Sequence, residues 1–298
     1  LSLDPAMRGW MNDGKSYIPP VGIGEVMRAG GVGVVVASKN PAYAVGDHVS
    51  CSPGVQEYCL IAESEIKRYS LAKIDLRGGS LTQWLNVLGM PGMTAYVGLK
   101  DVGLPKAGET LVVSGAAGAV GQTVGQLGKI LGLRVVGSAG GPEKCDWVVK
   151  ELGFDACVDY KAGHLKESLR ELCPKGVDVY FDNVGGEILD TVLTRITRGA
   201  RIVICGAISQ YNNTTPVQGP ANYMSLLVNR ARMEGMVVFD YIDRYPQAIA
   251  EMSGYLKAGK MKSKEDVATG GVKAFPETLL KLFSGANFGK LVLQVAAE

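Results

Sequence analysis

Apolar runs and amphipathic stretches alternate regularly along the middle of the chain. The short apolar runs predict buried strands, and the stretches between them repeat apolar positions at helical spacing. Strands that alternate with helices form a parallel sheet covered on both faces, so residues 81–254 are predicted to form a doubly wound α/β domain. The predicted strands are Leu111–Ser114, Val135–Ser138, Ala156–Asp159, Val177–Phe181, Arg201–Cys205 and Gly235–Phe239.

The flanking segments have a different pattern. Short alternating or apolar runs separated by Gly, Pro and Asn turns predict a β-rich, partly barrel-like domain over residues 1–80. The tail, residues 255–298, is expected to return to this domain. In residues 1–80, strands are predicted at Glu25–Arg28, Gly31–Ala37, Asp47–Ser50 and Gln56–Ala62. In the tail, strands are predicted at Glu265–Ala268 and Gly289–Val295, with a helix over Phe275–Phe283. Another helix is predicted to begin at Tyr245.

A glycine-rich turn follows the first strand of the α/β domain. Residues 116–121 read Ala-x-Gly-x-x-Gly, and a helix is predicted to begin at Ala119. Such glycines let backbone N–H groups approach a pyrophosphate at the positive end of the helix. A glycine triplet alone could mark an ordinary strand-to-helix turn, but the strand, helix and next strand all lie where a Rossmann dinucleotide site needs them.

The end of the second strand indicates which nicotinamide cofactor binds. Enzymes that use NAD place an acid there to accept the ribose hydroxyls, and this acid would repel a 2′-phosphate. Here the strand continues through Gly140 without an acid and reaches Lys144, a cation suited to a phosphate. Lys144 could also be an ordinary residue of a first helical turn. The pattern favours NADPH.

Composition excludes other classes of partner. The chain has 298 residues, of which 47% are hydrophobic and 20% charged, with a formal net charge of +2, so a basic nucleic-acid-binding or membrane-surface protein is not indicated. Apolar stretches such as Val32–Ala37 are far too short to span a bilayer. Six scattered cysteines predict neither a disulfide framework nor a zinc ribbon, which favours a reducing, cytoplasmic setting. Because the chain opens on Leu1–Pro5 without a methionine, we expect a preceding segment to be missing.

Four further motifs establish a family resemblance. They are Gly89–Tyr96, Phe181–Glu187, Cys205–Asn212 and Asn287–Lys290, and together with the glycine-rich turn they extend over most of the chain. The sequence resembles the zinc-independent medium-chain dehydrogenase/reductases, in the double-bond reductase branch of leukotriene/prostaglandin reductases, plant alkenal reductases and bacterial curcumin reductase. The resemblance implies a GroES-like catalytic domain beside the Rossmann domain, a homodimer, and NADPH-dependent reduction of the C=C bond of α,β-unsaturated ketones and aldehydes.

The resemblance also implies the cofactor-binding residues. The glycine-rich turn holds the pyrophosphate, a lysine and a tyrosine contact the 2′-phosphate, and the remaining positions line the nicotinamide end. For Cys205 the backbone alone is expected to matter. These residues are Gly118, Ala119, Val120 and Gly121; Lys144 and Tyr160; and Met90, Thr94, Asn183, Cys205, Gly206, Ala207, Ile208, Ser209, Tyr211, Val237, Val238, Phe239 and Asn287.

No metal is predicted. Met90 stands where zinc-dependent relatives have a zinc-binding cysteine, and no cysteines are clustered. The two histidines are His48 and His164, and a zinc site needs three or four convergent nitrogen or sulfur ligands.

The proton donor is expected to be a tyrosine or a bound water. Hydride transfer to the β-carbon of an enone leaves negative charge on its oxygen, so the site must supply a donor there and a proton for the α-carbon. The candidates are Tyr17 and Tyr211, either of which could instead be a packing residue. Many relatives have tyrosines where this chain has Ala6 and Val228, so their mechanism transfers incompletely. A zinc-independent quinone reductase and a non-catalytic NADPH-binding protein remain the alternatives.

Overall fold

The computed structural model describes residues 1–296. The chain divides into two compact units, Leu1–Gly89 with Lys264–Glu298, and Met90–Ser263. The boundaries lie at residues 89 and 263, whereas the sequence pattern predicted 80 and 254. Within residues 1–296, no helix combines the length and the apolar character that crossing a membrane requires.

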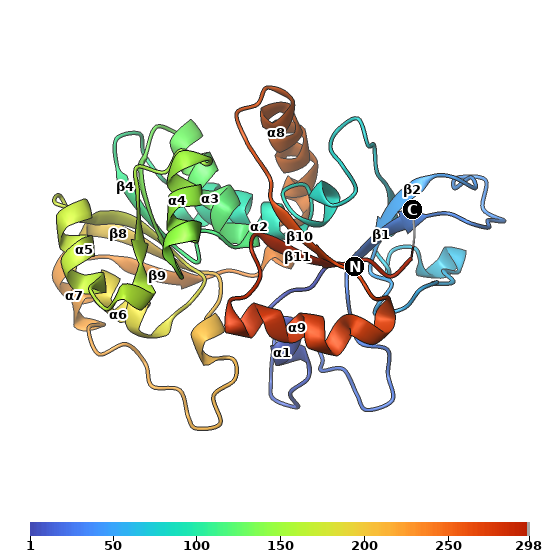
Figure 1. The fold of residues 1–298 in the computed structure, drawn as a ribbon, viewed down its shortest axis with the longest axis horizontal. Coiled ribbons are helices and arrows are strands. Elements are labelled where there is room, and N and C mark those ends of the chain that lie inside the picture. Colours follow the sequence, from blue (N-terminus) through green and yellow to red (C-terminus); the bar gives the residue numbers. More distant parts are fainter. Residues whose placement is uncertain (297–298) are drawn as a thin grey trace. The chain divides into compact units, whose positions relative to one another are not determined.

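The second unit contains a six-stranded sheet (Figure 1). All neighbouring strands are parallel, and their order is β6-β5-β4-β7-β8-β9. The chain therefore proceeds outward from β4 to β6 and then returns to the other side of β4, which places a topological switch point between β4 and β7. The strands are β4 (Thr110–Ser114), β5 (Arg134–Ala139), β6 (Ala156–Asp159), β7 (Val177–Asp182), β8 (Ile196–Ile204) and β9 (Arg232–Gly235).

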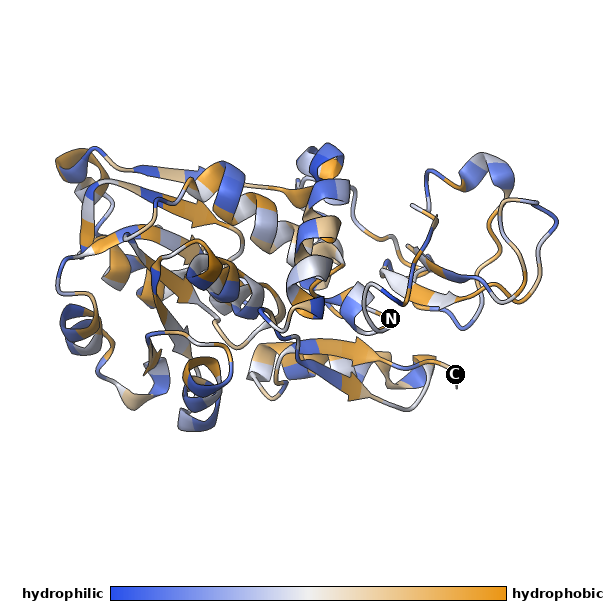
Figure 2. Cartoon of the chain, turned by 90° about the horizontal axis from the view of Figure 1, so that it is seen from above, coloured by the Kyte–Doolittle hydropathy of each residue, from blue (hydrophilic) through white to orange (hydrophobic). Residues whose placement is uncertain are grey.

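Helices cover both faces of this sheet, which confirms the predicted doubly wound class. On one face, Gly128 of α3 (Ala119–Ile130) lies so close to Leu111 that an added Cβ would approach its side chain to 2.7 Å. On the other face, α5 (Leu165–Leu172) and α6 (Gly186–Leu193) bury their apolar residues against Val112 and its neighbours. Figure 2 shows the apolar strands between helices with hydrophilic residues along their surfaces. The remaining helices of the unit are α2 (Met90–Val97), a π-helix (Gly98–Gly103), α4 (Pro142–Lys150), α7 (Met224–Asn229), α8 (Tyr245–Lys257) and 3₁₀ turns at Tyr160–Ala162, Ile208–Gln210 and Val238–Arg244.

The predicted last strand, Gly235–Phe239, is wrong in its position. The strand β9 ends at Gly235, and a 3₁₀ helix begins at Val238. The edge strand β9 pairs with β8 alone, and β8 ends at Ile204. After Gly235, one more backbone hydrogen bond reaches β8, from Met236 N to Ile204 O at 3.2 Å. Because β8 ends at Ile204, the ladder cannot continue past this bond.

The first unit contains two small sheets. The strands β1 (Gly31–Val34), β2 (His48–Cys51) and β3 (Ala72–Lys73) form an antiparallel sheet, and β10 (Glu265–Ala268) pairs in parallel with β11 (Lys290–Leu293). A short α1 (Met7–Trp10) and α9 (Phe275–Ser284) pack with the first residues of the chain into one apolar cluster. Short 3₁₀ turns occur at Glu63–Glu65, Gln83–Leu85 and Val272–Ala274.

A buried ion pair attaches the N-terminal segment to β11. The Lys290 side chain is 1% exposed and donates to Leu3 O at 2.7 Å and to Asp4 Oδ1 at 2.6 Å. Burial lowers the pKa of Lys290, and the Asp4 carboxylate opposes that change. Removal of either partner would leave an uncompensated charge in the core.

Two predicted strands of this unit, Glu25–Arg28 and Gln56–Ala62, are wrong. Among the described residues, the chain around these two segments is joined by two backbone hydrogen bonds, from Gly54 N to Ala29 O and from Val55 N to Met27 O. Several of the apolar side chains that suggested a half-buried strand are exposed: Val26 at 52%, Tyr58 at 74% and Leu60 at 94%. Alternation in sequence indicates a strand only where a partner ladder and a core face are both present.

Candidate functional site

The glycine-rich turn lies at the carboxyl edge of the sheet, between β4 and α3. A Cβ at Gly121 would lie 2.2 Å from Gly115 O, so the first turn of α3 packs directly on the backbone of the turn. Gly115 has a φ of +61°, a conformation that L-residues rarely adopt. The turn is therefore compact because of these two glycines.

The N-terminus of α3 is suited to an anion. Gly118 is the N-cap residue, has an extended backbone, and provides no side-chain cap. No acidic residue lies in the first turn. The first N–H groups of a helix have no intrahelical acceptor, and the helix dipole adds positive potential there. These residues fit the pyrophosphate of a dinucleotide.

At the switch point, a buried carboxylate connects β4 and β7. Asp182 is 1% exposed, and its Oδ1 accepts bonds from Ser114 Oγ at 3.0 Å and Tyr180 OH at 2.8 Å. The same oxygen accepts from the backbone N–H groups of Val184 (3.0 Å) and Gly185 (2.9 Å). Asp182 therefore determines the conformation of the loop after β7. Sequence reasoning did not assign this role, although an Asp-Asn-Val-Gly-Gly run after a buried strand was visible.

The loop after β7 in turn positions Asn183. Its backbone N–H donates to Ser114 Oγ at 2.9 Å, and its Nδ2 donates to Ser114 O at 2.7 Å. Asn183 O accepts from Ile208 N at 3.3 Å, which attaches the loop after β8. Residues predicted to line the nicotinamide end are thus held together by backbone contacts at the ends of adjacent strands.

Tyr211 closes the loop after β8 on itself. Its hydroxyl oxygen accepts a hydrogen bond from Ala207 N at 3.1 Å. A Cβ at Gly206 would approach this oxygen to 2.8 Å, so the glycine makes room for the phenol. The base of the loop is fixed by Cys205 N, which donates to Asp182 O at 2.9 Å. The ring of Tyr211 is therefore held at the carboxyl edge.

Two ionisable groups near Asp182 are kept neutral. Burial raises the pKa of the Cys205 thiol to about 12, and the nearby Asp182 carboxylate adds to that effect. Burial also raises the pKa of Tyr180 well above its usual value, again with Asp182 contributing. The raised pKa of Cys205 agrees with the expectation that its backbone, not its thiol, serves the site.

The corner beyond β5 is the expected place of the 2′-phosphate. Lys144 lies in the first turn of α4, whose N-cap Gly141 has no side-chain cap. A Cβ at Gly140 would lie 2.9 Å from Tyr160 OH, so the tyrosine hydroxyl lies directly against the bare backbone after β5. The structure thus places both predicted phosphate ligands, Lys144 and Tyr160, on segments that adjoin the end of β5.

The remaining predicted residues of this unit lie nearby or on adjoining elements. The segment Val237–Phe239 follows β9, next to the end of β8, with Val238 buried and Phe239 exposed. Met90 begins α2, and Thr94 Oγ1 donates to Met90 O at 2.8 Å.

Tyr17 and Asn287 belong to the first unit. Tyr17 is 53% exposed, and its hydroxyl oxygen accepts from Trp10 Nε1 at 3.2 Å. Asn287 Nδ2 donates to Gly289 O at 2.9 Å. Their roles towards a cofactor or substrate therefore stay predictions.

Possible metal ligands are scattered over the described part of the structure. Among the residues that it describes, no group of three or more His, Cys, Asp or Glu side chains is arranged to hold a metal ion. His48 is in β2, and His164 is the N-cap residue of α5. Metal independence stays a prediction for direct measurement.

Comparison with known proteins places this architecture in a family. Residues 1–68 match the N-terminal domain of oxidoreductases, and residues 119–254 match the family described as zinc-binding dehydrogenases. The chain is 45% identical to the NADPH-dependent curcumin reductase of Escherichia coli, over 100% of this chain and 86% of that protein. It is 43% identical to the NADP-dependent 2-alkenal reductase of Nicotiana tabacum, over 100% of this chain and 86% of that protein.

A solved structure has the same fold. CurA of Vibrio vulnificus, determined in complex with NADPH, superposes with a TM-score of 0.88 at 43% identity, covering 100% of this chain and 88% of CurA. Similarity at this level extends over both units. The chain belongs to the double-bond reductase branch of the zinc-independent medium-chain dehydrogenase/reductase family.

Proposed function

We propose that this protein is an NADPH-dependent oxidoreductase that reduces the C=C bond of α,β-unsaturated ketones and aldehydes. The observation that carries the proposal is the carboxyl edge of the sheet, where an uncapped N-terminus of α3 and the corner beyond β5 with Lys144 and Tyr160 fit a dinucleotide with a 2′-phosphate. The similarity to a curcumin reductase and an alkenal reductase along the whole chain supports the substrate class.

The residues of the chain bind and orient the cofactor and the substrate, while the bound cofactor supplies the hydride. Hydride addition to the β-carbon leaves negative charge on the carbonyl oxygen, which needs a hydrogen-bond donor. We propose Tyr17 and Tyr211 for this role and for proton delivery to the α-carbon. A phenol suits it because the group is neutral at physiological pH and has one proton to donate. The bond from Ala207 N to the phenolic oxygen holds the hydroxyl of Tyr211 at the carboxyl edge of the sheet.

An NADPH-oxidation screen tests the proposed function. Alkenals, aryl enones, prostanoid-like ketones and quinones would be offered with NADPH and, as a control, with NADH. We expect turnover to be highest with an enone or enal, and the product to be the saturated carbonyl compound by mass spectrometry. Faster turnover of quinones, with no saturated product from any enone, would identify a quinone reductase. NADPH binding without oxidation of any compound would identify a non-catalytic protein.

We further propose that the protein is a homodimer. The strand β9 is exposed along its whole length at the edge of the sheet. Beside β8 and β9, the helix α7 exposes Leu227 (68%) and Val228 (64%). An exposed edge strand with adjacent apolar surface is suited to pairing across a two-fold axis. Light scattering should give about twice the 31.5 kDa of one chain, and a monomer at micromolar concentration would contradict the proposal.

A reducing, cytoplasmic compartment is proposed as the site of action. All six cysteines are free thiols in the structure, which supports a setting where disulfides do not persist. Fractionation of producing cells should recover the protein with cytoplasmic markers, and recovery with exported proteins would contradict this.

A further inference from the structure

A second lysine lies at the corner beyond β5. The Cβ that Gly140 lacks would lie 2.9 Å from Tyr160 OH and 3.0 Å from Lys161 Cε. The side chains of Tyr160 and Lys161 therefore both lie over the bare backbone of Gly140. A side chain at position 140 would displace them, so the glycine allows a hydroxyl and an ammonium group to lie close to the end of β5.

Asp159 fixes this arrangement through the backbone. Its Oδ1 accepts from Gly141 N at 2.9 Å and from Lys161 N at 3.0 Å. One carboxylate oxygen thus connects the N-cap of α4 with the 3₁₀ turn that carries Tyr160 and Lys161. The two segments that would enclose a phosphate are joined before any ligand binds, which lowers the entropy cost of binding.

The charge of Lys161 is not neutralised within the chain. Within residues 1–296 its ammonium group makes no hydrogen bond or ion pair, and its side chain is exposed. Some lysines of the same unit do form ion pairs, as Lys150 does with Asp146 at 2.6 Å and Lys129 with Asp155 at 2.7 Å. A lysine without a carboxylate partner, held beside a tyrosine hydroxyl and an uncapped helix N-terminus, is suited to a dianionic phosphate.

We propose that Lys161 binds the 2′-phosphate of NADPH, together with Lys144 and Tyr160, and contributes to the preference for NADPH over NADH. The inference rests on the proposed function, because it concerns the same cofactor. The sequence alone did not indicate this role for Lys161. Lys161 adjoins Tyr160, but neighbours in sequence need not face the same ligand. The contact of its Cε with the Gly140 position provides the evidence that it does.

Binding of 2′,5′-ADP and 5′-AMP tests the inference without turnover, because these nucleotides differ only in the 2′-phosphate. Calorimetry on Lys161→Ala should show binding of 2′,5′-ADP weakened about tenfold, the usual scale for one charge-assisted contact, and binding of 5′-AMP unchanged. Lys161→Arg should retain most of the affinity. The matched control is Lys150→Ala, which removes the same charge from the far end of α4 and should bind both nucleotides as the wild type does.

The outcomes separate this inference from the proposed function. The role of Lys161 would be overturned if Lys161→Ala weakened the binding of both nucleotides equally, or if it bound 2′,5′-ADP as Lys150→Ala does. In either case, NADPH binding by the wild type would leave the proposed function intact. Wild-type protein that binds NADPH no more tightly than NADH would overturn both. Circular dichroism melting of each variant verifies that the fold is retained.

Discussion

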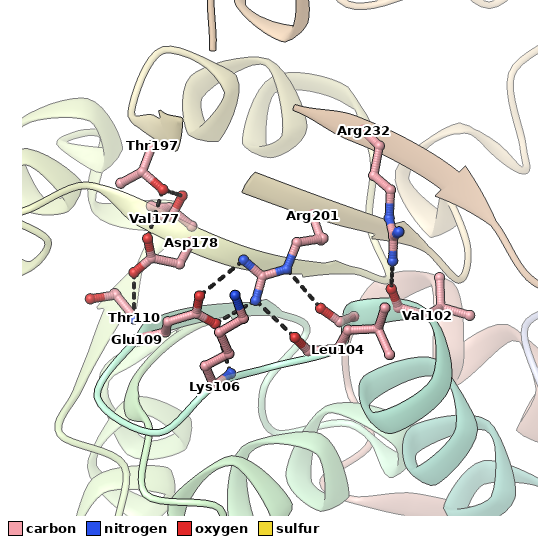
Figure 3. Close-up of polar contacts among 11 residues, drawn as sticks. Val102, Leu104, Lys106, Glu109, Thr110, Val177, Asp178, Thr197, Arg201 and Arg232 are labelled. Carbon is pink, nitrogen blue, oxygen red and sulfur yellow. Dashed lines mark hydrogen bonds and ion pairs between the residues drawn. The ribbon is translucent and has the colours of Figure 1, made fainter. Parts of the chain in front are cut away.

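The two edges of the parallel sheet are built differently. At the amino edge, polar groups are used within the chain: Arg201 donates to Gly103 O at 2.9 Å and Leu104 O at 3.0 Å and pairs with Glu109 (Figure 3). Asp178 likewise accepts from Thr110 N at 2.8 Å and from Thr197 Oγ1 at 2.7 Å.

At the carboxyl edge, polar groups remain available to a ligand. The N-terminus of α3 has no side-chain cap, and Lys161 has no ion pair within the described chain. The amino edge is thus used for cohesion, whereas the carboxyl edge is the one proposed to bind the cofactor. Substitutions at the two edges should therefore affect different measurements, and the predictions below test this separation.

The largest expected effect is at the carboxyl edge. Tyr211→Phe keeps the ring but removes the hydroxyl, and with it the acceptor of the Ala207 N bond, so kcat on the best enone should fall by about 10²–10³ if this hydroxyl is the main oxyanion donor. The affinity for NADPH, measured by fluorescence titration, should change little. Tyr17→Phe is the parallel test in the first unit. Near-wild-type kcat in both variants would exclude both phenols and leave an ordered water or a cofactor hydroxyl as the donor.

At the amino edge, the expected effect is on stability. Glu109→Gln breaks the ion pair between Glu109, whose side chain is 20% exposed, and Arg201, whose side chain is 14% exposed. This substitution should lower the free energy of unfolding by about 1–3 kcal/mol. Urea unfolding measures this change, while the KM for NADPH should stay unchanged. A variant of normal stability with altered KM would contradict the separation of the two edges.

The same pair predicts a pH dependence. Burial works to raise the pKa of the Glu109 carboxyl, but hydrogen bonds from Arg201 and from Lys106 N bring it below its ordinary value of 4.5. A lowered folded-state pKa contributes stability that is present above pH 4.5 and is lost as the pH falls through the folded-state value. The stability difference between wild type and Glu109→Gln should therefore be largest near pH 7 and shrink towards pH 3. A constant difference would argue against the ion pair.

The cofactor preference gives a smaller expected effect. Lys144→Ala should weaken the NADPH complex by about 1–3 kcal/mol, seen as a raised KM, and should change the KM for NADH little. The fold should melt as the wild type does, because Lys144 is in the first turn of α4 and is not a core residue. Equal effects on both cofactors would refute the assignment.

Chelation should have no effect at either edge. Dialysis against a chelator is expected to leave activity intact, and elemental analysis should find no stoichiometric zinc. Loss of turnover that added zinc restores would show that the site is metal-dependent.

Features that depend on local sequence were the most predictable. The glycine-rich turn and its flanking strand and helix were predicted correctly, because Gly115, Gly118 and Gly121 impose their geometry within a few residues. The NADPH prediction followed from the strand end without an acid and from Lys144, and the reaction followed from the family resemblance. The family resemblance then extended these to the whole chain.

Features set by distant partners were less predictable. The position of β9 depends on where β8 ends, at Ile204, and the apolar run after Gly235 contains no sign of that limit. The role of Lys161 depends on the bare backbone of Gly140, which lies on a neighbouring strand end far away in sequence. The alternation of apolar and polar residues at Gln56–Ala62 suggested a strand, but no strand pairs with this segment among the described residues.

The raised pKa of Cys205 has a consequence for an enzyme that handles electrophiles. Unsaturated carbonyl compounds alkylate thiolates by conjugate addition, and thiols are the side chains that they modify fastest. With its pKa raised to about 12, the Cys205 thiol stays protonated at pH 7. The raised pKa beside Asp182 thus protects the loop after β8 from inactivation by the compounds that the protein is proposed to reduce.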